Sequence, residues 1–181
     1  MQNVSGALKI CRELGLTEER FYNAMLNFKG PSKRLQLLSK NESVSVFLDF
    51  AHSPSNISAT LKAVRQQYPD RQLVACMELY SASNLNENFL DQYNGTMDLA
   101  DVKYVYYNKS LLKKNKMKII DEDQISAAFG NSHIKIFTDH NELLKELYSI
   151  NWQNKNLIFM SSGDFSGINF DEVANKIALK N

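Results

Sequence analysis

The stretch VSVFLDFAHSPSNISATLKAVRQQY, residues 44–68, decides the fold. Its first part alternates as a strand does, with Val44, Val46 and Leu48 on one side. Pro54 suits the first position of a helix, and apolar residues then follow at helical spacing: Ile57, Leu61, Val64 and Tyr68. The stretch therefore predicts a strand, a short polar loop and a helix.

The same order of strand and helix recurs toward the C-terminus. Apolar runs typical of strands centre on residues 73–76, 102–107, 134–137 and 157–160, with helical patterns between and after them. A preceding segment at 35–37 is expected to form a hairpin with residues 44–48. Such alternation predicts an α/β fold: a three-layer, Rossmann-like, mostly parallel sheet with helices on both faces. In these sheets ligands collect where strands end and helices begin. We therefore expect function in the loops after Leu48, Met77, Tyr107 and Met160.

The first thirty residues have a different pattern. Two short amphipathic helices are expected, the first ended by Gly15 and the second capped by Thr17. Gly30 and Pro31 then break the helical pattern. This predicts a helical hairpin over residues 1–29 and an α/β domain over residues 30–181.

Composition limits the possible functions. The 181 residues are 44% hydrophobic and 23% charged, with a net charge of +1. These values predict a packed core and no long-range field for nucleic acid or an anionic membrane. No apolar run approaches the length of a membrane span, and no secretory leader is recognised. Cys11 and Cys76 lack the spacing of a zinc or redox pair. We expect a cytoplasmic protein without nucleic-acid or membrane partners.

The loop of residues 49–54 holds the densest cluster of reactive side chains. Asp49 and His52 follow a buried-type strand and precede a helix N-terminus, where an anion is favoured. The alternative is that Asp49 caps the turn and His52 packs beneath it. A metal would need a third ligand, and neither His133 nor His140 has ligand-like spacing. No metal site is expected.

Two other segments belong to the same predicted edge. Lys33 and Arg34 place two cations before the first strand, where they could bind phosphate or carboxylate or remain a solvated pair. Ser161, Ser162 and Gly163 follow the last strand; they could hold an anion or form a plain turn. The chain lacks the glycine-rich phosphate loop, the dinucleotide motif and the Gly-x-Ser-x-Gly elbow.

The string FKGPSKR at 28–34, followed by DFAHSP at 49–54, resembles the opening of the C-terminal domain of Mur ligases. These enzymes make amide bonds in peptidoglycan precursors. Residues 78–86, 95–101 and 160–163 are similar to the branch that attaches murein peptide to UDP-N-acetylmuramate and to its alanine-adding relative.

The resemblance implies an ATP-dependent ligation in which a carboxylate becomes an acyl phosphate and an amine then attacks it. Lys33, Arg34 and Asp49 would bind the nucleotide, Arg34 toward phosphate and Asp49 toward ribose. The catalytic candidate, His52, would sit near the reacting end. The incoming amino acid or peptide would be held by Tyr80, Ser162 and Gly163, although relatives often carry His or Arg where Tyr80 stands.

The resemblance also implies partners outside this chain. ATP and Mg would be bound mainly by an upstream central domain, of which residues 1–29 would be the tail. The partners would be these upstream ligase domains, a UDP-muramoyl substrate, and an amino acid or peptide. Alone, the chain is expected to be inactive. Two alternatives stay open: an adaptor for a small anion or a protein partner, and a ligase domain of the folylpolyglutamate synthase type.

Overall fold

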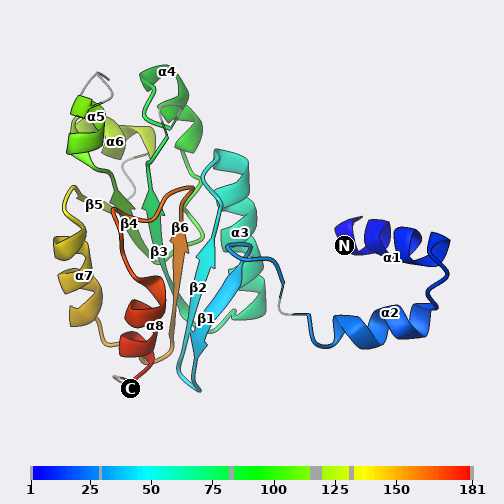
Figure 1. Cartoon of the computed structure of the whole chain (residues 1–181). Helices are drawn as coiled ribbons and strands as arrows, with labels where there is room; N and C mark the ends of the chain where they lie inside the picture. Colours follow the sequence, from blue (N-terminus) through cyan, green and yellow to red (C-terminus); the bar gives the residue numbers. More distant parts are fainter. Residues whose placement is uncertain (1, 29, 82–83, 115–119, 131–132, 180–181) are drawn as a thin grey trace. The chain divides into compact units, whose positions relative to one another are not determined.

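The computed structural model describes residues 2–28, 30–81, 84–114, 120–130 and 133–179 (Figure 1). The chain divides into two compact units, Met1–Ser32 and Lys33–Asn181. No helix within the described ranges is long and apolar enough to cross a membrane.

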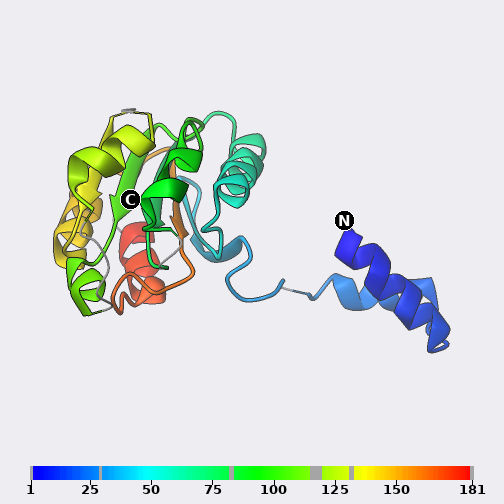
Figure 2. The same ribbon diagram turned by 90° about the horizontal axis from the view of Figure 1, so that it is seen from above.

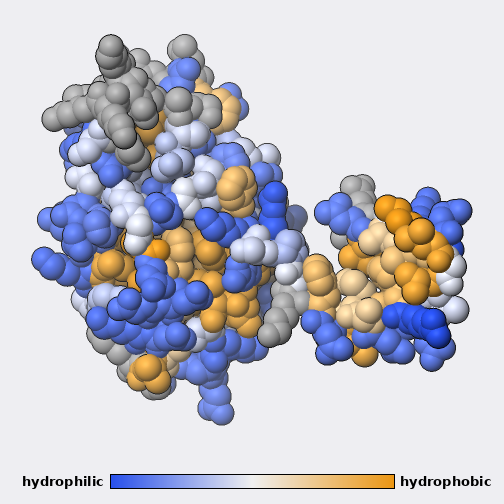
Figure 3. Space-filling view, in the orientation of Figure 1, coloured by the Kyte–Doolittle hydropathy of each residue, from blue (hydrophilic) through white to orange (hydrophobic). Residues whose placement is uncertain are grey.

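The first unit is a pair of helices, α1 (Gln2–Glu13) and α2 (Glu18–Met25). Gly15 takes a φ of 80° after α1, and the Thr17 side chain caps α2 by accepting a bond from the Arg20 N–H. Apolar side chains gather on the surface of this unit (Figure 3), among them Ile10, Leu14, Leu16, Tyr22, Leu26 and Phe28. The assignment of this hairpin to a preceding ATP-binding domain stays a prediction.

The second unit is built on a six-stranded sheet. Its strands are β1 (Gln36–Lys40), β2 (Val44–Asp49), β3 (Gln72–Glu78), β4 (Val102–Tyr106), β5 (Ile134–Phe137) and β6 (Lys155–Met160). They lie in the order β1-β2-β6-β3-β4-β5. The β1 strand is antiparallel to β2, and the remaining pairs are parallel. The predicted mostly parallel α/β sheet is therefore confirmed.

Helices cover both faces of the sheet (Figure 2). They are α3 (Pro54–Gln67), α4 (Glu87–Leu90), the 3₁₀ turn η1 (Asp91–Tyr93), α5 (Lys109–Lys114), α6 (Glu122–Ala128), α7 (His140–Ser149) and α8 (Phe170–Ala178). One core joins α3, η1 and α6 to side chains such as Phe47, and the other joins α7 and α8 to Val46 and Leu48. Because successive strand residues point to opposite faces, β2 contributes to both cores.

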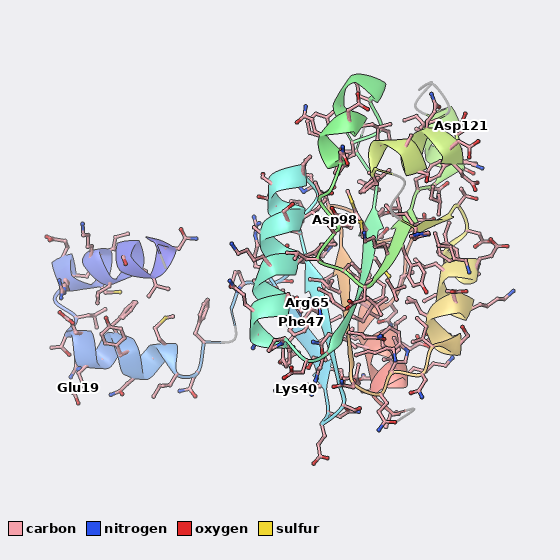
Figure 4. The ribbon with its side chains drawn as sticks, turned by 180° about the vertical axis from the view of Figure 1, so that it is seen from behind. Glu19, Lys40, Phe47, Arg65, Asp98 and Asp121 are labelled. Atoms are coloured by element: carbon pink, nitrogen blue, oxygen red, sulfur yellow. The ribbon has the colours of Figure 1, made fainter. Side chains whose placement is uncertain are left out.

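Polar contacts hold the helices at their ends. Asp121 and Gln124 form a capping box at the start of α6, with the Asp121 side chain 2.8 Å from the Gln124 N–H (Figure 4). Arg65 of α3 donates to the Leu99 carbonyl at 2.7 Å and to Asp101 at 2.6 Å. These bonds tie α3 to the segment that precedes β4.

The strand order decides which loops meet. The carboxyl ends of β2, β6 and β3 are adjacent, since Asp49 pairs with Met160 and Met160 with Met77. The amino end of β1 lies at the same edge, because β1 runs antiparallel and Gln36 pairs with Leu48. Residues 33–35, 49–54, 78–80 and 161–165 therefore share one edge of the sheet, toward which the arrowheads of β2, β6 and β3 point (Figure 1).

Candidate functional site

A strained turn carries the two cations at this edge. Lys33 and Leu35 take left-handed φ angles of 54° and 44°. For residues other than glycine this conformation costs roughly 1–2 kcal/mol each. The Leu35 N–H donates to Asp49 Oδ2 at 2.5 Å, and the Lys33 carbonyl accepts from the Phe50 N–H at 2.8 Å. Strained backbone of this kind persists only where its surroundings hold it, and such places are often functional.

Asp49 is the main support of that turn. The residue is 7% exposed, and Oδ1 accepts from the Ala51 N–H at 2.8 Å and from the Thr60 hydroxyl at 3.2 Å. With Leu35 this makes three donors, whereas a carboxylate has about four acceptor positions. These bonds fit the alternative in which Asp49 serves the backbone. The contact with ribose stays a prediction.

Arg34 lies in the middle of the turn and stacks on an aromatic ring. Its guanidinium carbon is 5.5 Å from the centre of the Phe50 ring, which in turn contacts the His52 ring edge-on at 5.1 Å. Arg34 is exposed, and among the described residues no carboxylate lies within ion-pair distance of Arg34 or Lys33. Arg34 is thus available to an anion, whereas the charge of Lys33 already offsets part of the rise in the pKa of Glu78.

His52 is fixed through its ring and its backbone. Nδ1 lies 2.8 Å from the Phe50 carbonyl, which can only accept, so Nδ1 carries the proton of the neutral ring and Nε2 is left as an acceptor. The His52 carbonyl accepts from the Tyr93 hydroxyl at 2.8 Å and from the Asn84 amide at 3.1 Å. Burial raises the pKa of Tyr93 to about 12, so its hydroxyl keeps the proton it donates.

Glu78 is a residue of this edge that is not among the site residues predicted from the sequence. It ends β3, is 1% exposed, and accepts bonds from the Ser161 hydroxyl and, at 2.9 Å, from the Phe165 N–H. Burial raises the pKa of Glu78, and the bonds from Ser161 and Phe165 offset part of that rise. The available signal was a carboxylate that directly continues the apolar run of residues 73–77. Glu78 holds the loop after β6 onto the end of β3.

The turn after β6 packs closely against Glu78 and Tyr80. A Cβ on Gly163 would lie 2.6 Å from Tyr80 Cδ2 and 2.7 Å from Glu78 Oε2, so only glycine fits. The Lys33 ammonium donates to the Gly163 carbonyl at 3.5 Å. The Ser162 hydroxyl oxygen is buried and has no partner among the described residues. A buried hydroxyl without a partner costs stability, and such groups are uncommon in folded proteins.

The structure thus brings the predicted site residues into two neighbouring groups. One contains Lys33, Tyr80 and Gly163, and the other contains Arg34, Asp49 and His52. The groups are joined where the Ser161 N–H donates to the Asp49 carbonyl at 3.1 Å. Together they offer two cations, an imidazole acceptor and a buried hydroxyl. In the part of the chain that the structure describes, no three His, Cys, Asp or Glu residues gather as metal ligands would.

Comparison with known proteins gives a family. Residues 33–163 match the family described as Mur ligase, glutamate ligase domain. The chain is 28% identical over 177 residues to the UDP-N-acetylmuramate–L-alanine ligase of Chlorobium phaeovibrioides. That alignment covers 93% of this chain and 38% of the relative, so the chain spans well under half of the relative's length.

Solved structures show the same fold. The UDP-N-acetylmuramate-alanine ligase of Thermotoga maritima matches 98% of this chain and 36% of its own, with a TM-score of 0.69 and 18% identity. The murein peptide ligase of Psychrobacter arcticus matches 87% of this chain and 32% of its own, with a TM-score of 0.62 and 24% identity. The resemblance to the C-terminal domain of Mur ligases is therefore confirmed.

Proposed function

Because the chain belongs to the Mur ligase family through its glutamate ligase domain, we propose that it closes the active site of an ATP-dependent ligase. The ligase joins an amino acid or murein peptide to UDP-N-acetylmuramate in the cytoplasm. The observation that carries this proposal is the exposed Arg34, which has no carboxylate within ion-pair distance among the described residues. It shares an edge with Lys33 and with the unpartnered Ser162 hydroxyl. The similarity to an alanine-adding ligase over 93% of the chain supports it.

The cations form the nucleotide side of the proposed site. Arg34 binds phosphate through its planar guanidinium, and Lys33 adds a point charge beside the Gly163 carbonyl. When bound, ATP supplies the phosphoryl group that activates the substrate carboxylate. ATP and Mg are held mainly by a preceding domain, since the chain lacks a phosphate loop.

The other group forms the amine side of the proposed site. The absence of a side chain on Gly163 lets the turn after β6 pack directly against Tyr80 and Glu78. The Ser162 hydroxyl beside it donates to the carboxylate of the incoming amino acid. His52 presents Nε2 as an acceptor for the proton that the attacking amine releases. A neutral Tyr80 in place of a cation favours an amine substrate with little extra negative charge at that position.

The test uses the complete ligase, in which the ATP-binding and UDP-substrate domains precede this chain. ADP release should require UDP-N-acetylmuramate together with L-alanine or a murein peptide. Arg34→Ala should reduce it, whereas Lys40→Ala, a cation on β1 that contacts the Tyr68 ring, should not. Release of ADP with a folate and glutamate instead would favour the folylpolyglutamate type. No ADP release with either substrate pair would reject a ligase role.

A further inference from the structure

We propose that Asp49 and Phe50 are positioning residues for Arg34: Asp49 holds the backbone turn that carries Arg34, and Phe50 holds its guanidinium. This inference rests on the proposed function, because it assigns to Arg34 the phosphate contact. It gives Asp49 a part in the reaction that does not need a contact with the nucleotide.

The bonds of Asp49 carry the first half of the proposal. Its Oδ2 accepts from Leu35, the residue directly after Arg34, at 2.5 Å. Leu35 is left-handed at φ 44°, a conformation that a leucine leaves readily unless something holds it. Oδ1 accepts from Ala51 and Thr60, and Asp49 as a whole is 7% exposed. The carboxylate therefore faces inward, toward the turn and α3.

The contacts of Phe50 support the second half of the proposal, in which Phe50 holds the Arg34 guanidinium. Its N–H donates to the Lys33 carbonyl at 2.8 Å, so it also fixes the residue directly before Arg34. Its ring lies 5.5 Å from the Arg34 guanidinium carbon, within the range of a cation–π contact. An exposed arginine has several free torsions, and the ring limits the positions that its guanidinium samples. Consecutive residues of β2 and its loop thus hold both sides of Arg34 and its side chain.

Hydrogen exchange on this chain tests the turn directly. With Asp49→Ala, we expect the Leu35 amide, assigned by NMR, to exchange about tenfold faster or more, because it loses its acceptor. Thr60→Val is the matched control: it removes a donor to Asp49 but leaves the bond to Leu35, so Leu35 exchange should stay within about twofold of the parent value. Unchanged Leu35 exchange in the Asp49→Ala chain would overturn the proposal.

A kinetic cycle in the complete ligase tests the link to Arg34. Asp49→Ala should lower kcat by about tenfold or more when Arg34 is present, and by less than about twofold in the Arg34→Ala background. The loss should be the same with 2′-deoxy-ATP and 3′-deoxy-ATP as with ATP. A loss that disappears with either deoxynucleotide would mean direct ribose contact. A loss that adds fully to that of Arg34→Ala would mean that Asp49 acts independently of Arg34. Either result would overturn the proposal.

Variants of Phe50 test the ring contact through kcat, which would not distinguish leucine from tyrosine if Phe50 only supported the fold. Phe50→Leu should lower kcat by about two- to fivefold, the worth of a cation–π contact, and Phe50→Tyr should retain the parent rate because it keeps the ring. Equal losses for leucine and tyrosine would contradict the ring contact. Lack of ADP release in the unaltered ligase would reject the proposed function, whereas the Leu35 exchange result decides the turn independently.

Discussion

Replacing Glu78 with alanine should lower the free energy of unfolding of the Lys33–Asn181 unit by about 2–6 kcal/mol. The carboxylate accepts bonds from the Ser161 hydroxyl and the Phe165 N–H, and both residues are at most 1% exposed. Each buried donor left without a partner costs about 1–3 kcal/mol. Glutamine keeps a side-chain oxygen for the same donors and carries no charge, so Glu78→Gln should cost less than about 1 kcal/mol.

Urea unfolding followed by tryptophan fluorescence measures this difference. Trp152 is the single tryptophan of the chain and is fully buried in the second unit, so its emission reports that unit and not the helical pair. The urea midpoint should fall strongly for Glu78→Ala and little for Glu78→Gln. The slope of the free energy of unfolding against urea concentration should be unchanged. Equal midpoints for the two variants, or a loss below about 1 kcal/mol for alanine, would refute the reasoning.

The same pair of variants has a predictable pH dependence. Burial raises the pKa of Glu78 in the folded state, so the folded chain holds this proton more tightly than the unfolded chain does. The resulting stabilisation is fully present below the usual glutamate pKa of about 4.3 and is lost as the pH rises through the folded value. The Glu78→Gln variant should therefore gain stability relative to the parent as the pH rises from about 4. If the free energies of unfolding of the parent and of Glu78→Gln changed in parallel with pH, a raised pKa of Glu78 would be contradicted.

Further variants test the rest of the edge. Gly163→Ala should lower the free energy of unfolding by about 1–3 kcal/mol, measured from urea midpoints. Adding Tyr80→Ala should recover part of that loss, because two of the three atoms closest to the added Cβ belong to the Tyr80 ring. Ser162→Ala should stabilise the chain by up to about 1 kcal/mol in the same assay, since it removes a buried unpaired hydroxyl, yet raise KM for the amine substrate in the complete ligase. An unchanged KM would exclude the substrate contact. Arg34→Ala and Arg34→Lys should both lower ADP release by about tenfold or more, because an ammonium cannot replace a planar fork.

The strands and most of the long helices could be predicted from apolar spacing, but their order in space could not. Residues 44–68 carry a strand, a turn with Pro54 and a helix within one local stretch, so the pattern suffices there. The insertion of β6 between β2 and β3 depends on pairings such as Val46 with Leu157 and Leu157 with Val74. No local spacing encodes such a pairing, because every parallel strand of this unit has a similar apolar run.

The residues of the candidate site show the same limit of prediction from local sequence. Lys33, Arg34 and His52 could be proposed because charged and reactive side chains stand out beside a strand end. Glu78 could not be distinguished from the solvated end of a strand, since its burial arises only when residues 161–165 pack over it. The sequence does not decide the role of Asp49 for a related reason. Loop carboxylates bind the backbone and ligands with the same atoms, and only the positions of the donors distinguish the two roles.

The location of strain supports the choice of this edge independently of any motif. Six described residues other than glycine have a positive φ, and three of them, Lys33, Leu35 and Phe165, lie in the loops of this edge, with Ser166 directly after them. The buried carboxylate of Glu78 and the unpaired Ser162 hydroxyl lie there as well. Each of these features costs stability, and a sequence under no constraint but folding would lose them readily. Their concentration where β2, β6 and β3 end is explained if the edge must present Arg34 and the turn after β6 to a ligand.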